Sequence, residues 1–114
     1  MNKLTTSLKA LSDKNRLRIL KLLEQKDMCV CELAHIIDIA QPSVSRHLKK
    51  LKQAGLITSE QDGSWTNYKL IRKQNDFHIR NILNQTLETL DEENIIQKDL
   101  ETAKMADRNK LCSS

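Results

Sequence analysis

The sequence predicts a mainly α-helical (α+β) fold: a winged helix-turn-helix with a two-stranded wing and a long C-terminal dimerisation helix. Three observations support this. Apolar residues recur with helical spacing over most of the chain, and one short stretch has the composition of a β-hairpin around an Asp-Gly turn. With 114 residues, two glycines and one proline, the chain has room for one domain, 1–114, made of helices with few sharp turns.

Three helices are predicted before residue 40. Leucines spaced for one helical face indicate the first helix: Leu4, Leu8 and Leu11. Ser12 or Asp13 can cap a second helix. Its apolar stripe carries Leu17, Leu20 and Leu23. A break near 27–28 precedes a short third helix at 32–37, and residues 38–40 form a tight connection.

The fourth helix, predicted at about 42–54, has the features of a DNA-recognition helix. It opens at Gln41 or Pro42 and stops at Gly55. Val44, Leu48 and Leu51 share the face that must meet the core. The rest of the helix carries donors and cations suited to phosphates and base edges. The candidate DNA-binding residues are Gln41, Ser43, Ser45, Arg46, His47 and Lys50.

The wing is predicted at about 56–71, with the turn at Asp62-Gly63. Asp62 at its tip is unfavourable beside phosphate, so we expect weaker DNA contacts from the wing than from the helix. From about 75–108, apolar periodicity predicts one long helix with more apolar surface than a small domain covers. We therefore expect a homodimer, which would read operator DNA with an inverted repeat.

Charge and composition narrow the class of protein. The net charge of +4 divides into a basic segment at 43–73 and an acidic one at 88–101. No apolar run is long enough to cross a membrane, and the N-terminus lacks a secretory signal, so we expect a cytoplasmic protein with reduced thiols. Neither a Gly-rich phosphate loop nor an acid–base set is recognisable, so we expect no enzyme.

Cys29 and Cys31, separated by Val30, are the candidate ligands for a soft, thiophilic ion. At the start of the third helix, backbone N–H dipoles would lower a thiol pKa. Residues i and i+2 of a regular helix point to nearly opposite sides, so one ion holds both sulfurs only where that turn is non-helical or distorted. Such distortion would shift the third helix against the recognition helix. Cys112 is the remaining thiol, either a third ligand or a free cysteine.

Four blocks resemble the ArsR/SmtB family of metal-responsive repressors: 13–23, 28–33, 41–48 and 51–57. The resemblance implies a homodimer that represses its own operon and leaves DNA when an ion binds, with no cofactor required for DNA binding. Cys29-Val30-Cys31 before Glu32-Leu33 is similar to the arsenite and antimonite sensors, which implies As(III) or Sb(III) as inducer. Those sensors often carry a third cysteine where this sequence has Ala34.

Other inducers remain open at this point. The cadmium/lead sensors of the family use cysteines from an N-terminal extension that this sequence does not have. The zinc sensors use ligands on the dimer helix, and here Asp76, His78 and Glu92 match that spacing while Thr89 replaces a histidine. We interpret these as a degenerate remnant of a zinc site. A redox- or persulfide-responsive repressor would use the same fold, with Cys29 or Cys31 oxidised.

Overall fold

The structure, a computed structural model, describes residues 1–112. Its elements are α1 (Asn2–Leu11), α2 (Lys14–Gln25), α3 (Val30–Ile37), α4 (Gln41–Gln53), β1 (Ile57–Asp62), β2 (Trp65–Leu70), α5 (Phe77–Thr89), the 3-10 turn η1 (Leu90–Glu92), α6 (Asn94–Met105) and α7 (Arg108–Leu111). This order confirms the predicted winged helix-turn-helix.

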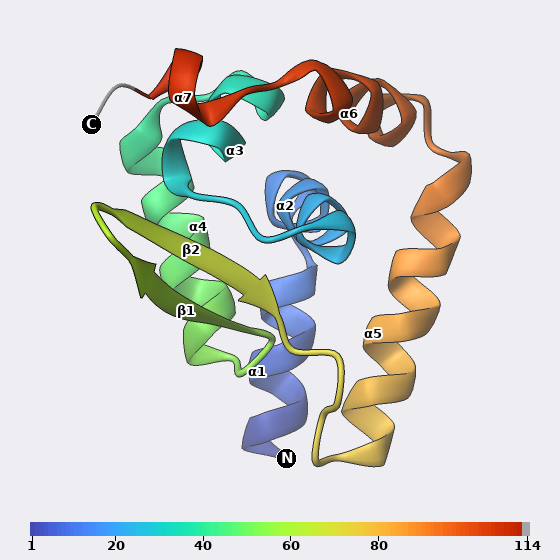
Figure 1. Cartoon of the computed structure of the whole chain (residues 1–114). Helices are drawn as coiled ribbons and strands as arrows, with labels where there is room; N and C mark the ends of the chain where they lie inside the picture. The colour runs from blue at the N-terminus through green and yellow to red at the C-terminus, as the bar shows by residue number, and fades with distance from the viewer. Residues whose placement is uncertain (113–114) are drawn as a thin grey trace.

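Helix α2 forms the centre of the molecule. In Figure 1 it is seen nearly end-on, with α5 along one side, α3, α4 and the hairpin on the other, and α6 with α7 across one end. Its apolar side chains Ile19, Leu20, Leu22 and Leu23 are fully buried, as expected for a helix covered from several sides. Asp13 caps its N-terminus by accepting hydrogen bonds from the backbone N–H groups of Asn15 and Arg16.

Helices α3 and α4 form the helix-turn-helix. Asp38 ends α3 in the left-handed conformation (φ 58°), which aspartate tolerates better than most residues. In α4 the predicted core face is confirmed, because Val44, Leu48 and Leu51 are all buried. Packing of these three side chains turns the opposite face of α4 to solvent.

The wing is confirmed as a β-hairpin. Strands β1 and β2 pair antiparallel from Ile57 opposite Leu70 to Asp62 opposite Trp65, and Gly63 adopts the positive φ (61°) that this tight turn requires. A further bridge joins Met28, just before α3, to Tyr68 in β2, with hydrogen bonds in both directions at 3.2 and 2.8 Å. The wing is therefore attached directly to the segment that leads into α3.

The prediction of one continuous helix over about 75–108 is wrong. Helix α5 ends at Thr89, and after η1 the backbone of Glu93 is extended (ψ 129°) before α6 begins. Two causes are visible. Acidic residues crowd the C-terminal end of α5, where the helix dipole disfavours negative charge. The buried Lys21 also donates to the carbonyl of Leu87 at 2.9 Å, which satisfies a carbonyl of the last turn.

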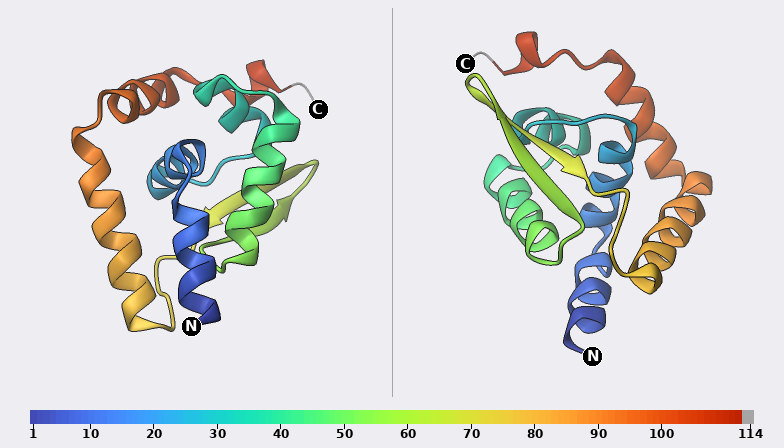
Figure 2. Two further views of the ribbon diagram at one scale, coloured as in Figure 1. Left: turned by 180° about the vertical axis from the view of Figure 1, so that it is seen from behind. Right: turned by 60° about the horizontal axis from the view of Figure 1, so that its bottom comes forward.

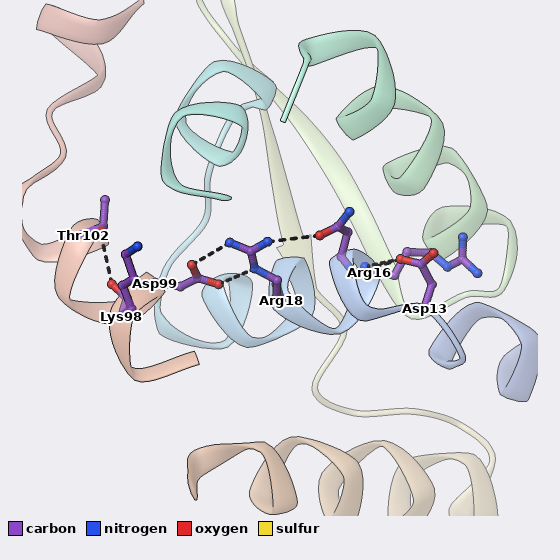
Figure 3. Close-up of polar contacts among 7 residues, drawn as sticks. Asp13, Arg16, Arg18, Lys98, Asp99 and Thr102 are labelled. Atoms are coloured by element: carbon purple, nitrogen blue, oxygen red, sulfur yellow. Dashed lines mark hydrogen bonds and ion pairs between the residues drawn. The ribbon is translucent and has the colours of Figure 1, made fainter. Parts of the chain in front are cut away.

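After this break, α6 turns back onto α2. Arg18 of α2 donates two hydrogen bonds, of 2.8 and 2.9 Å, to the carboxylate of Asp99, which is 3% exposed (Figure 3). Lys21 pairs with Glu24 and Asp91 near the other end of α2. These contacts fix the C-terminal region across the top of the fold. None of the helices within residues 1–112 is long and apolar enough to span a membrane.

Candidate nucleic-acid interface and thiol site

All six predicted DNA-contacting residues lie on α4, which runs along the surface beside α1 (Figure 2). Gln41, Ser45, Arg46 and Lys50 are exposed, whereas Ser43 and His47 are half-buried. Arg46 donates to the Ser43 hydroxyl at 3.0 Å, so the guanidinium is held along the helix. These six residues thus present two cations and several side chains that both donate and accept, the chemistry needed for phosphates and base edges.

His47 is turned toward the protein more than the sequence indicated. Its Nδ1 lies 3.4 Å from Nη1 of Arg16, whose guanidinium also donates to the backbone carbonyls of Ala10 and Lys9. Burial lowers the pKa of the His47 imidazole, and the positive charges of Arg16, Arg46 and Lys50 lower it further, against the opposing effect of Asp13. A neutral ring accepts from Arg16 through Nδ1 and keeps an Nε2–H donor for another partner.

The wing offers less positive charge than α4. Its lysine, Lys69, pairs with Glu60 at 3.2 Å and with Asp27 at 3.7 Å. Lys52, at the end of α4, donates to Ser59 of β1 at 2.7 Å and ties the wing to the helix. The acidic neighbours of Lys69 make the hairpin a weaker partner for phosphate than the exposed face of α4.

Cys29 is the N-cap residue of α3 and lies outside the regular helix, with φ −90° and ψ 168°. Its thiol is buried and donates to Oε1 of Glu32 at 3.4 Å, while the same oxygen accepts from the Cys29 backbone N–H at 3.1 Å. The expected lowering of its pKa is wrong: burial raises the pKa of the Cys29 thiol, and the Glu32 carboxylate adds to the increase. Cys29 is therefore a protonated thiol at neutral pH.

The expectation that all thiols are reduced is wrong for two of them: Cys31 and Cys112 form a disulfide that joins the first turn of α3 to the residue after α7, with their Cα atoms 6.0 Å apart. Figure 1 shows why the two meet, since α7 lies across α3 at the top of the fold. Both Cys112 and Cys29 are less than a tenth exposed. The contact spans 81 residues of sequence, so no local pattern indicated it.

The structure brings together two of the three candidate sulfur ligands. Within residues 1–112 there is no group of three His, Cys, Asp or Glu side chains positioned to hold a metal ion. The Cys29 sulfur faces Glu32, so a three-sulfur site requires a rotation of its side chain. Sulfur-only donors suit a soft ion, and the extended backbone at Cys29 meets the geometric condition for two sulfurs to approach one ion.

The zinc-type ligands are separated within one chain. Asp76 caps α5, accepting from the backbone N–H groups of His78 and Ile79. Glu92 lies in η1, beyond the other end of that 13-residue helix, roughly 20 Å away at 1.5 Å rise per residue. One subunit cannot bring Asp76, His78 and Glu92 to a single ion.

The segment that carries Cys29 and Cys31 is connected to both α4 and the wing. Helix α3, which carries Cys31, packs directly on α4. Met28, next to Cys29, pairs with Tyr68 of the wing. The start of α3 is therefore linked to α4 by direct packing and to the hairpin by the bridge between Met28 and Tyr68.

Two basic residues next to α4 were not singled out from the sequence. Lys9 of α1 and Arg16 of α2 lie beside Lys50, and together they line one hollow with Thr6, Ala10 and Gln53. Arg16 falls in the 13–23 block, but neither its periodicity nor its neighbours indicated contact with α4. Only the packing of α1 and α2 against α4 reveals this group.

Comparison with known proteins identifies the family. The profile described as "Bacterial regulatory protein, arsR family" matches residues 13–59. The arsenical resistance operon repressor of Bacillus subtilis is 38% identical over 88 residues, which cover 76% of this chain and 80% of that protein. The arsenic resistance transcriptional regulator of Pseudomonas putida is 40% identical over 63 residues, or 54% of this chain. The match spans only about half (49%) of the length of that regulator.

Among solved structures, the homodimeric winged helix-turn-helix DNA-binding domain from Mycobacterium bovis superposes with a TM-score of 0.65 at 24% identity, covering 80% of this chain and 81% of that one. This likeness supports the fold. From the matched profile and the Bacillus subtilis relative, the chain belongs to the arsR family of bacterial regulatory proteins, which are DNA-binding transcriptional regulators and not enzymes.

Proposed function

We propose that this protein is a homodimeric transcriptional repressor that binds an inverted-repeat operator through α4 and is released by As(III) or Sb(III). DNA binding is supported by the exposed face of α4, with Arg46 and Lys50 and no ion pair to neutralise either within residues 1–112. A regulator of bacterial operons acts in the cytoplasm, and we assign this chain there. The names of the Bacillus and Pseudomonas relatives support arsenic as the inducer.

Dimerisation is supported by apolar side chains that the single subunit leaves exposed. On α1 these are Leu4 and Leu8, 38% and 47% exposed, and on α5 and α6 they are Phe77 and Ile95, 57% and 49% exposed. Covering them with a second copy removes apolar surface from water. A dimer would hold its two α4 helices about 34 Å apart, one turn of DNA.

What supports the inducer site most directly is the approach of Cys112, which follows α7, to Cys31 on α3, the helix that packs against α4. In the reduced protein, As(OH)₃ would exchange hydroxide for thiolate sulfur, each thiol proton leaving with a hydroxide as water. Cys31 and Cys112 supply two sulfurs, and rotation of Cys29 away from Glu32 supplies the third. That rotation breaks the contact between the Cys29 thiol and Glu32 at the N-terminal turn of α3 and disturbs the packing of α3 against α4.

A second candidate is favoured by the same contact. Oxidation of the Cys31 and Cys112 thiols by a peroxide forms the disulfide, reduces the peroxide to water or alcohol plus water, and would lock α7 onto α3. In that case a thiol oxidant, and not an ion, sets the affinity for DNA. When arsenite is added to reduced protein without an oxidant, the first candidate predicts release from DNA and the second predicts no release.

Fluorescence anisotropy of reduced protein on its own promoter DNA tests the proposal. We expect binding, then release by arsenite or antimonite at low molar ratios. Cys29→Ser and Cys31→Ser should bind DNA and no longer release it. Release by peroxide alone would favour the redox candidate, and release by zinc or cadmium alone would refute arsenic and antimony as inducers.

The DNA face is tested by Arg46→Ala, with Lys98→Ala on exposed α6 as matched control. Loss of a base or phosphate contact by Arg46 should reduce affinity by on the order of tenfold, or about 1.4 kcal/mol, while Lys98→Ala should bind like the wild type. Equal binding by both variants would refute the assignment of α4 as the DNA-contacting helix.

A further inference from the structure

A small hollow lies where α1, α2 and α4 meet. Its walls are Thr6, Lys9 and Ala10 of α1, Arg16 of α2, and Lys50 and Gln53 of α4. Its volume is about 190 Å³. Figure 2 shows α1 and α4 side by side along this part of the molecule.

The charge in this hollow is of one sign. Three of its six lining residues are cations, Lys9, Arg16 and Lys50, and none is an acid. Neither Lys9 nor Lys50 forms an ion pair with any residue in the described range 1–112. Thr6 and Gln53 add a hydroxyl and an amide, both hydrogen-bond donors. The set is suited to an oxyanion.

Arg16 is fixed in place before any ligand arrives. Its Nε donates to the Ala10 carbonyl at 2.8 Å and its Nη2 to the Lys9 carbonyl at 3.1 Å. The Asp13 carboxylate accepts from backbone N–H groups at the start of α2 and does not line the hollow. Because the Arg16 guanidinium is already held in place between two lysines, its side chain loses little conformational entropy when an oxyanion binds.

The hollow continues the DNA-facing surface of α4. Ser43, Arg46, Lys50 and Gln53 follow one another at spacings of three or four residues and form one stripe along the helix. The stripe runs from the N-terminal turn of α4 into the hollow. On α1, Thr6 and Lys9 lie on the side opposite Leu4 and Leu8 by the 100° turn per residue, so a partner covering the leucines leaves the hollow open.

We propose that Lys9, Arg16 and Lys50 bind a backbone phosphate of the operator, so that α1 and α2 extend the DNA contact beyond α4. The ligand class is a phosphodiester, recognised by charge and hydrogen bonds and not by base sequence. The inference rests on DNA binding by α4. It adds one phosphate contact per subunit, two per dimer.

Lys9→Gln tests this contact, because the residue is exposed and belongs to no predicted base-reading set. The measurement is the DNA dissociation constant as a function of salt concentration. Removing one of the three cations at each of the two phosphates should reduce the slope of log K against log salt by at most about 1.8 and weaken binding on the order of tenfold at 0.1 M salt. The loss should be equal for operator and unrelated DNA, since a phosphate contact carries no sequence information.

Two control variants fix the interpretation. Lys9→Arg keeps the charge and should retain the wild-type slope, and Lys98→Gln removes an exposed lysine on α6 and should change nothing. A Lys9→Gln protein that matches the wild type in slope and affinity overturns the proposal while leaving DNA binding by α4 intact. A wild-type protein that binds no DNA overturns the proposed function and this inference together.

Free phosphate is the competing occupant. Inorganic phosphate is added to the DNA-free protein while amide chemical shifts are recorded for α1 and α4. The DNA proposal is refuted by three results together: phosphate saturates the wild-type hollow at millimolar concentration, Lys9→Gln abolishes that saturation, and the variant still binds DNA normally. The site then holds a free anion. Parallel loss of DNA affinity and salt slope supports it.

Discussion

Replacing Asp99 by Asn should destabilise the protein by about 3 kcal/mol. The Asp99 carboxylate is buried and accepts two hydrogen bonds from Arg18, whose side chain is 14% exposed. Each such charge-assisted bond contributes about 1.5 kcal/mol, and breaking one partner of a buried pair costs about 3–5 kcal/mol. Because Arg18 keeps some contact with water, we expect a loss at the lower end of this range. Figure 3 shows this pair joining α2 to α6.

This loss of unfolding free energy corresponds to a decrease in melting temperature. At about 2.1 cal/mol/K per residue, 114 residues give an unfolding entropy near 0.24 kcal/mol/K, so 3 kcal/mol lowers Tm by about 12 °C. Circular dichroism should follow unfolding by heat and urea at one fixed protein concentration, since a dimer's stability depends on concentration. Glu101→Gln, exposed on the same helix, is the matched control and should stay within about 0.5 kcal/mol of the wild type. An Asp99→Asn protein within about 1 kcal/mol of the wild type would refute the reasoning.

Two more substitutions test the fold. Asp13→Ala removes the cap of α2 and should cost about 1 kcal/mol at pH 7. Burial alone would raise the pKa of Asp13, but the backbone N–H of Arg16, the charge that His47 carries at acid pH and the charge of Arg16 outweigh it, so this pKa lies below its usual value. The stabilisation is therefore complete above about pH 4 and fades as pH falls through the folded pKa. Leu83→Ala, at a site 2% exposed between α5 and the core, should cost about 3 kcal/mol.

Urea unfolding by circular dichroism measures both effects. For Asp13→Ala, a deficit that persists unchanged at pH 2.5 would contradict the charge-dependent cap. For Leu83→Ala, the control is Asn84→Ala on the exposed side of α5. Similar stability of these two variants would show that α5 is not packed on the core through Leu83.

The helix-turn-helix and the wing could be predicted because their signals are local. Val44, Leu48 and Leu51 fix the buried face of α4 by spacing alone, and Asp62-Gly63 fixes the turn between two strands. The break at Glu93 could not be predicted in the same way. Apolar residues recur with helical spacing on both sides of it, and the break depends on Lys21 and Arg18 of α2, which are more than 65 residues away.

The candidate sites likewise include residues that local sequence patterns predict and contacts that only long-range packing creates. Cys29, Cys31 and the exposed residues of α4 were found by residue type and spacing. The contact of Cys31 with Cys112, the Glu32 partner of the Cys29 thiol and the hollow at Lys9 depend on how distant segments pack. The pKa of Cys29 was predicted in the wrong direction because a helix N-terminus is visible in sequence and the burial of a thiol is not.

The proposed release from DNA requires little energy, and the start of α3 can supply it. A hundredfold loss of affinity corresponds to about 2.8 kcal/mol. Drawing the Cys29 sulfur toward Cys31 breaks its contact with Glu32 and strains the adjacent Met28, whose two backbone hydrogen bonds hold Tyr68 of the wing. At about 1 kcal/mol for each of these three bonds, their loss matches the amount required. Since the same turn begins the helix that packs on α4, the proposed ion binding there would weaken both DNA-facing elements at once.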